Sequence, residues 1–272
     1  MGNKKIVLAP DSFKDSISAR AICKLLKEMI IEEYPCYNVI SLPVSDGGEG
    51  FVDALSESLQ LKLIQKQVMG PGQQKVQGSY GINGKTAFLE MAQSSGLQHL
   101  SKDERNPLKT TTYGFGELMK DTIGHDIKKL VLGIGGSATC DGGAGMAQAL
   151  GAKFYDKEGS LIQKPMTGEL LKLCYKIETR ELNKRIKDYE FLVACDVTNP
   201  LLGENGAVYV YAPQKGACKK ELPLLEENMS RLNQLFEKDL NKSVKNVPGA
   251  GAAGGLGAGL MAFLGAELKS GS

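Results

Sequence analysis

The sequence has no tryptophan and only two histidines. His99 and His125 are too few and too isolated for a histidine metal cluster. The six cysteines are scattered and form no CxxC pair, so neither a zinc site nor a disulfide scaffold is expected. Reduced thiols and a cytoplasmic location are the corresponding prediction.

The chain also lacks a strong charge imbalance and a long apolar run. Its formal net charge is +2 and its basic residues are dispersed, so no nucleic-acid partner is expected. No apolar stretch approaches the ~18 residues of a membrane helix, so no membrane partner is expected. The first residues, "MGNKKIVLAPD", show no signal-peptide layout. What remains is a globular protein of 272 residues, long enough for two domains.

Apolar runs and amphipathic segments alternate at the start of the chain. Residues 4–11 and 37–46 have the pattern of short buried strands, and helical periodicity covers 16–35 and about 51–59. This order predicts parallel strands joined by crossover helices. Residues 61–92 contain shorter strand-like runs around "NG", a hairpin signal, and predict a mixed or antiparallel insertion.

Further strands and helices are expected in the second half of the chain. Buried strands are predicted near 128–136 and 189–196, and a hairpin around 158–159. No strand is predicted after the helix-like run "GAGLMAFLG". Helices are expected over the following segments: 110–125, 144–151 and 221–240.

Four aspartates directly follow apolar runs: Asp11, Asp46, Asp141 and Asp196. Ligands of open α/β sheets bind beyond the carboxyl ends of the strands, where such residues gather. One or two carboxylates can hold Mg²⁺, and another can accept a hydroxyl proton during phosphoryl transfer. The alternative for each aspartate is a helix cap or a turn.

The glycine-rich stretch "GIGGSATCDGGAG", residues 133–145, leads from a predicted strand to a predicted helix. Main chain without Cβ atoms brings N–H groups within reach of phosphate oxygens, and a helix N-terminus adds positive charge. Two alternatives are a tight packing turn and a dinucleotide motif in "GIGGSA" with Asp156 as the ribose ligand. The dinucleotide motif fits poorly, because the helix begins only at about Ala144. The lysine of a P-loop is absent.

Four basic residues lie near these loops: Lys14, Arg105, Lys109 and Lys215. Each could hold a carboxylate or a phosphate, although a single cation is more often a solvated surface charge. Cys140 and Cys195 have no histidine partner and are expected to be small core residues. The "TTT" at 110–112 either caps a helix or offers its hydroxyls to a ligand, and the cap is favoured.

Seven segments together resemble the type I glycerate kinase family, in the family's order and across nearly the whole chain. They are "APDSFKDS" (9–16), "SDGGEG" (45–50), "ERNPLKTTTYGFGEL" (104–118), "GIGGSATCDGGAGMAQALG" (133–151), "ACDVTNPLLG" (194–203), "APQKGA" (212–217) and "PGAGAAGGLGAGLMAFLGA" (248–266). The resemblance implies transfer of the γ-phosphoryl group of ATP to D-glycerate, giving 2-phosphoglycerate, with Mg²⁺ as cofactor.

The resemblance also implies an α/β fold with two domains and substrates between them. We expect a Rossmann-like parallel-sheet domain, incomplete in its C-terminal part, and an inserted α/β domain with a mixed sheet. Residues 1–70 are assigned to the first part of the Rossmann-like domain. Residues 71–272 are assigned to the inserted domain and to the start of the return to the Rossmann-like domain. A homodimer is one assembly considered.

Site residues are assigned to roles within this resemblance. The catalytic candidates are Asp196 and Lys14, and the metal ligands are Asp46 and Asp196. The substrate candidates are Arg105, Lys109, Asp11 and Ser12. The phosphate-binding candidates are Gly135, Gly136, Ser137, Gly251, Gly254, Gly255 and Gly257.

Two features depart from the family pattern. Asp15 stands where the family usually has glycine, and the family's later "GEGR" stretch and final strands have no counterpart before Ser272. Two other functions are therefore considered. One is a shortened, non-catalytic chain that binds nucleotide or substrate, and the other is an NAD(P)-dependent oxidoreductase.

Overall fold

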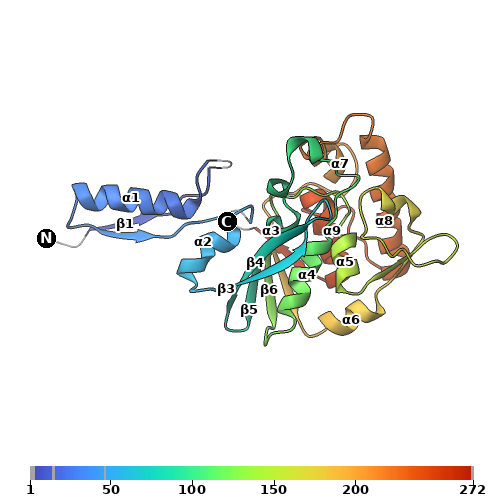
Figure 1. Cartoon of the computed structure of the whole chain (residues 1–272), viewed down its shortest axis with the longest axis horizontal. Helices are drawn as coiled ribbons and strands as arrows, with labels where there is room; N and C mark the ends of the chain where they lie inside the picture. The colour runs from blue at the N-terminus through green and yellow to red at the C-terminus, as the bar shows by residue number, and fades with distance from the viewer. Residues whose placement is uncertain (1–3, 14–15, 46, 271–272) are drawn as a thin grey trace.

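The computed structural model describes residues 4–13, 16–45 and 47–270. The described chain is an α/β structure with a small N-terminal unit beside a larger body built on a six-stranded sheet (Figure 1). A mixture of parallel and antiparallel strands confirms the predicted fold class. In the part of the chain that is described, no helix combines the length and apolar character needed to cross a membrane.

The N-terminal unit consists of β1 (Lys5–Leu8), α1 (Ala19–Glu33) and β2 (Asn38–Ser41). The two strands pair in parallel, as the alternation of apolar and amphipathic segments predicted. Ser18 caps α1, because its hydroxyl oxygen accepts the N–H of Ala21 at 3.2 Å. The helix ends before Pro35.

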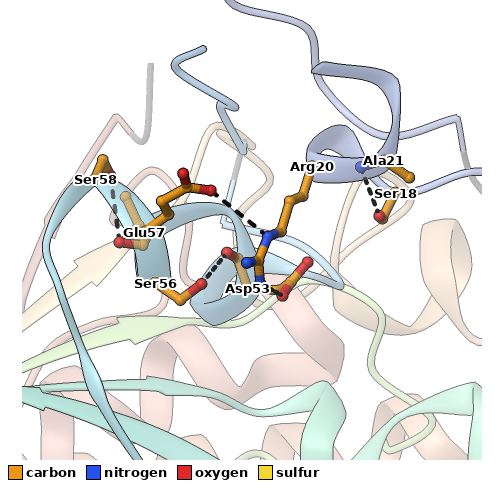
Figure 2. Close-up of polar contacts among 8 residues, drawn as sticks. Ser18, Arg20, Ala21, Asp53, Ser56, Glu57 and Ser58 are labelled. Atoms are coloured by element: carbon orange, nitrogen blue, oxygen red, sulfur yellow. Dashed lines mark hydrogen bonds and ion pairs between the residues drawn. The ribbon is translucent and has the colours of Figure 1, made fainter. Parts of the chain in front are cut away.

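Helix α2 (Phe51–Ser58) lies next to α1 and joins the N-terminal unit to the larger body (Figure 1). Figure 2 shows Arg20 of α1 between two acidic side chains of α2, 3.6 Å from Asp53 and 3.7 Å from Glu57. About half of each of the Arg20 and Asp53 side chains is exposed, and Glu57 is more exposed still. Exposed ion pairs contribute at most about 1 kcal/mol, so these contacts orient the helices more than they stabilise them.

The larger body is built on a sheet with strand order β10-β9-β6-β5-β4-β3. Strands β3, β4 and β5 pair with one another in antiparallel order. The turn at Asn83-Gly84 joins β4 to β5, which confirms the predicted hairpin. The remaining neighbours pair in parallel. The strands are β3 (Lys62–Met69), β4 (Lys75–Asn83), β5 (Thr86–Glu90), β6 (Lys129–Gly133), β9 (Glu190–Ala194) and β10 (Glu267–Lys269).

One sequence prediction needs correction. A strand does follow the last helix, because β10 pairs in parallel with residues 192–194 of β9. Its three residues are too few to show a period, and the neighbouring strand supplies the hydrogen bonds that define it. The domain boundary at residue 70 stays a prediction, and β3, which begins at Lys62, belongs to the six-stranded sheet.

Helices and a second small sheet surround the six-stranded sheet (Figure 1). The α-helices are α3 (Ala92–Ser95), α4 (Tyr113–Thr122), α5 (Ala144–Leu150), α6 (Arg180–Ile186), α7 (Ala207–Tyr211), α8 (Leu222–Leu240) and α9 (Ala252–Leu264). The short 3₁₀ helices are η1 (Leu97–His99), η2 (Lys102–Glu104), η3 (Leu170–Leu173) and η4 (Pro213–Lys215). Strands β7 (Lys153–Tyr155) and β8 (Lys176–Glu178) pair with each other.

Helix α9 lies at the centre of the core and is almost entirely buried. Phe263 of this helix makes edge contacts with the rings of Phe154 and Phe236. Small residues on α9 let other main chain approach closely, so that a Cβ on Gly259 would collide with the carbonyl oxygen of Gly142. The loop before α5 is therefore held directly against the core helix.

Candidate active site

The predicted glycine loop connects β6 to α5 at the carboxyl edge of the sheet. Helix α5 begins at Ala144, as the sequence predicted. Neighbouring segments fix the loop: Gly135 donates its N–H to Gly47, and Ala138 to Ser95, at 3.0 and 2.9 Å. Within the described residues, the N–H groups of Gly136 and Ser137 have no hydrogen-bond acceptor. These bonds hold the loop in place and leave the main-chain N–H groups of Gly136 and Ser137 available to a ligand.

A second glycine loop, residues 47–50, packs against the first. A Cβ on Gly135 would lie 2.5 Å from the Cα of Gly48, and a Cβ on Gly47 would lie 2.7 Å from the carbonyl oxygen of Ala194. Only glycine permits these approaches. The predicted metal ligand Asp46, which precedes this loop, lies outside the described residues, as does Lys14.

Asp196 lies at the same edge of the sheet. Gly133 pairs with Ala194 in the β6–β9 register, so Asp196 and Gly135 each stand two residues beyond paired positions. Adjacent strands are about 4.8 Å apart, which places Asp196 next to the glycine loop. Asp196 is exposed and accepts a hydrogen bond from the hydroxyl of Ser270 at 2.5 Å. It is the strand-end carboxylate that a ligand at this edge can reach.

Asp141 caps a helix, which is the alternative to ligand binding that the sequence left open for each of the four aspartates. It is fully buried and accepts the N–H and the hydroxyl of Thr112, both at 2.8 Å, and the N–H groups of Gly143 and Gly145 at 3.2 Å. Burial raises the pKa of Asp141, and these four donors act in the opposite direction. The residue joins the start of α5 to the start of α4, so it is structural.

The third glycine loop, residues 249–257, links the ends of β9 and β6. Gly251 donates to the carbonyl of Asn199 at 2.9 Å, and Gly254 accepts from Gly142 at 3.2 Å. Ala253, Gly254 and Gly255 are consecutive left-handed residues that interrupt the first turn of α9. Gly257 is buried where a Cβ would collide with the carbonyl of Gly249.

Replacing Gly254 with alanine is expected to lower the free energy of unfolding by about 2–5 kcal/mol. The residue has φ +67°, and a Cβ there would collide with the carbonyl oxygen of Thr139. Gly159→Ala is a matched control, because Gly159 has φ +79° and nothing within 4 Å of its added Cβ. The control is expected to lose only about 1–2 kcal/mol. Equal losses in urea unfolding would show that the collision at Gly254 is relieved without cost.

The predicted substrate cations lie on one segment beside the glycine loop. Thr110 ties this segment to the loop by donating its hydroxyl to the carbonyl of Ala138 at 2.8 Å. Arg105 is half-buried, and its Nε is buried with no hydrogen-bond partner among the described residues. Lys109 is exposed. Arg105 is therefore the better placed of the two for an anion.

Asp11 and Ser12 follow β1, at the carboxyl end of the small parallel sheet. Asp11 accepts the N–H of Ser12 at 2.6 Å, and Pro10 accepts that of Val44 at 3.1 Å, which places them beside the segment leading to the 47–50 loop. Within the described residues, no hydrogen bond or ion pair joins Asp11 or Ser12 to residues 133–137. The structure does not bring them together with the glycine loop directly.

The sequence reasoning missed Glu90, the last residue of β5. It is fully buried and accepts the N–H groups of Gly50 and Val52 at 2.9 and 3.2 Å, so it holds the 47–50 loop on the sheet. Burial is the main cause that raises the pKa of Glu90. The signal was available, because Glu90 ends the apolar run "TAFL" as the four aspartates end theirs.

Among the described residues, no group of three or more histidine, cysteine, aspartate or glutamate side chains is placed to hold a metal ion. Mg²⁺ commonly binds through one or two carboxylates and the phosphates of a nucleotide. Exposed Asp196 fits that donor set.

Comparison with known proteins agrees with this geometry. A model of the glycerate kinase family matches residues 6–272. The chain is 48% identical to a glycerate 2-kinase of Escherichia coli and 44% identical to a glycerate kinase of Bacillus subtilis, each over 98% of this chain and 70% of the relative. A crystal structure of a putative glycerate kinase 2 from Salmonella typhimurium superposes with a TM-score of 0.89 at 42% identity, covering 99% of this chain and 72% of the other. The chain belongs to the glycerate kinase family.

Proposed function

We propose that this protein transfers the γ-phosphoryl group of ATP to D-glycerate and releases 2-phosphoglycerate and ADP. Membership of the family and the 48% identity to a glycerate 2-kinase support the reaction class. The structural observation that carries the proposal is the glycine loop. Its unpaired N–H groups at Gly136 and Ser137 lie at the sheet edge that also presents Asp196.

The three glycine loops suit a triphosphate. Gly135, Gly136 and Ser137 are proposed to contact phosphate oxygens, together with the left-handed turn at Gly254 and Gly255 and the neighbouring Gly251. Successive main-chain N–H groups in such turns form anion-binding concavities. Gly257, also predicted to bind phosphate, is proposed to act by allowing α9 to pack closely.

Phosphoryl transfer depends mainly on positioning and charge neutralisation. The glycerate hydroxyl oxygen bonds to the γ-phosphorus, the bond to the bridging oxygen of ADP breaks, and the hydroxyl proton passes to a carboxylate. Asp196 is the proposed acceptor of that proton and a proposed Mg²⁺ ligand. Mg²⁺ would neutralise phosphate charge when bound. Asp46 and Lys14 remain predicted contributors.

Arg105→Gln is expected to raise the KM for glycerate about 10–100-fold, with a smaller effect on the KM for ATP. A guanidinium binds a carboxylate with two parallel hydrogen bonds, and such charged pairs are worth about 1.5–3 kcal/mol. The unpartnered Nε of Arg105 is the donor available for this contact. Steady-state kinetics with each substrate varied in turn would check the assignment. A change confined to ATP would contradict it.

The function itself is tested with the whole chain, ATP, Mg²⁺ and D-glycerate. ADP formation that requires glycerate, with the product identified by ³¹P NMR, is expected, as is loss of activity on chelation and recovery with Mg²⁺. Binding of ATP without turnover would favour a non-catalytic binding protein. Binding of NADPH instead would favour an oxidoreductase, although the late start of α5 speaks against that. A cytoplasmic location and a homodimer stay predictions.

A further inference from the structure

Lys215 is a fully buried lysine at the end of η4, with 1% of its surface exposed. Its Nζ donates to the hydroxyl oxygen of Ser137 at 2.6 Å and to the carbonyl oxygen of Thr139 at 2.7 Å. Lysine is rarely buried to this extent without a paired carboxylate, because desolvation of the ammonium is costly. Within the described residues, no carboxylate lies within ion-pair distance of Lys215.

Asp141 is the carboxylate nearest in sequence to Ser137 and Thr139, and it already has hydrogen-bond partners of its own. Asp141 accepts four hydrogen bonds, from Thr112, Gly143 and Gly145. Burial is the largest effect and lowers the pKa of Lys215, while the neighbouring Cys140 and Asp141 act in the opposite direction. The amine therefore faces the glycine loop with no carboxylate bonded to it among the described residues.

The contact with Ser137 fixes the direction of its hydroxyl. In this contact the Lys215 amine donates and the Ser137 oxygen accepts. The hydroxyl hydrogen of Ser137 then has to be donated elsewhere, and no acceptor for it is found among the described residues. The main-chain N–H of Ser137 and that of Gly136 are unpaired as well. The two main-chain N–H groups and the Ser137 hydroxyl are thus three hydrogen-bond donors, on adjacent residues, that one acceptor could engage.

The surroundings are shaped to admit this ammonium. Gly254 leaves the space it needs, since a Cβ there would lie 2.9 Å from Nζ. Because Gly254 also accepts from Gly142, the lysine lies where the loops 133–145 and 249–257 meet. A single side chain from a third segment therefore bonds the 133–145 loop and lies beside Gly254 of the 249–257 loop.

We propose that Lys215 is a positioning residue for the phosphate groups of the nucleotide. Its ammonium holds the Ser137 hydroxyl as a donor toward a phosphate oxygen and adds a buried positive charge next to the loop. This assignment rests on the proposed kinase function and adds to it a residue that acts through Ser137 rather than by touching the substrate.

The test compares Lys215→Met, Ser137→Ala and the double variant in the whole chain, with Lys220→Met as control. Lys220 is an exposed neighbour in the same connection. Methionine keeps the length of the buried side chain and removes its charge. Kinetic constants for ATP and for glycerate are measured together with the midpoint of thermal unfolding.

Lys215→Met is expected to lower kcat/KM for ATP about 100-fold. The KM for glycerate is expected to stay within about twofold, while the unfolding midpoint is expected to fall below that of the control, because the buried carbonyl of Thr139 loses its donor. The double variant is expected to be no slower than Lys215→Met alone, since the lysine acts through the Ser137 hydroxyl.

Three results would overturn the proposal. Wild-type kinetics with a lowered unfolding midpoint would make Lys215 purely structural. An effect on the glycerate KM alone would assign the anion to glycerate. Effects of the two substitutions that multiply in the double variant would show that the residues act independently.

Two further measurements keep the proposal testable. Should Lys215→Met fail to fold, Lys215→Gln replaces it, because glutamine retains an N–H donor for Ser137; a loss of about tenfold is expected, and full activity would overturn the proposal. Should the wild type show no turnover, the kinase function fails by itself. Calorimetric binding of Mg·ATP to wild type and Lys215→Met then decides, with weaker binding in the variant expected and equal or absent binding in both contradicting the proposal.

Discussion

Asp196→Asn is expected to lower kcat about 10²–10⁴-fold while leaving the protein folded. Asparagine keeps the shape of the side chain but can neither accept the glycerate proton nor offer a charged oxygen to Mg²⁺. The side chain is exposed, so the free energy of unfolding should change by less than about 0.5 kcal/mol. Steady-state kinetics and thermal unfolding of the same preparations check both parts.

Asp188→Asn is the matched control. Asp188 is also exposed, but it precedes β9, whereas Asp196 follows it, so the two aspartates lie at opposite edges of the sheet. The control should retain wild-type kcat, because ligands bind at the carboxyl edge of such sheets. Wild-type turnover in Asp196→Asn would remove Asp196 from the mechanism, and an equal loss in both variants would point to a general effect of charge.

Asp141→Ala is expected to lower the free energy of unfolding by about 3–5 kcal/mol. The substitution leaves three main-chain N–H groups and the Thr112 hydroxyl without their acceptor in the core, and each unsatisfied buried donor costs about 1–3 kcal/mol before relaxation. Urea unfolding measures the loss. Activity should fall with the folded fraction, since Asp141 is fully buried.

Asp156→Ala tests whether burial causes that loss. Asp156 also accepts main-chain N–H groups, those of Glu158 and Ser160 at 3.0 and 2.8 Å, but in an exposed turn where water can replace it. A loss of about 1 kcal/mol or less is expected. Similar losses at the two positions would mean that the donors left by Asp141 find water or other partners.

Local patterns predicted the features that depend on neighbouring residues. The parallel pair β1 and β2, the hairpin at Asn83-Gly84 and the start of α5 at Ala144 all agree with the sequence. Strand β10 did not follow from local pattern, because three residues carry no periodicity and its hydrogen bonds come from β9, more than 70 residues earlier. The domain boundary at residue 70 stays a prediction, since the pairing of β3 with β4, which assigns β3 to the six-stranded sheet, does not follow from local pattern either.

The candidate site shows the same division. The sequence by itself determined the family through its ordered motifs, and it placed glycines and acids at the ends of strands, since short-range pattern records where strands stop. It could not separate Asp141 from Asp196, which follow apolar runs alike. Only the tertiary structure decided that Asp141 is buried under donors from Thr112 and that Asp196 is exposed. Burial and hydrogen-bond partners depend on which distant segments pack together, and the same packing placed Lys215 against Ser137, 78 residues away.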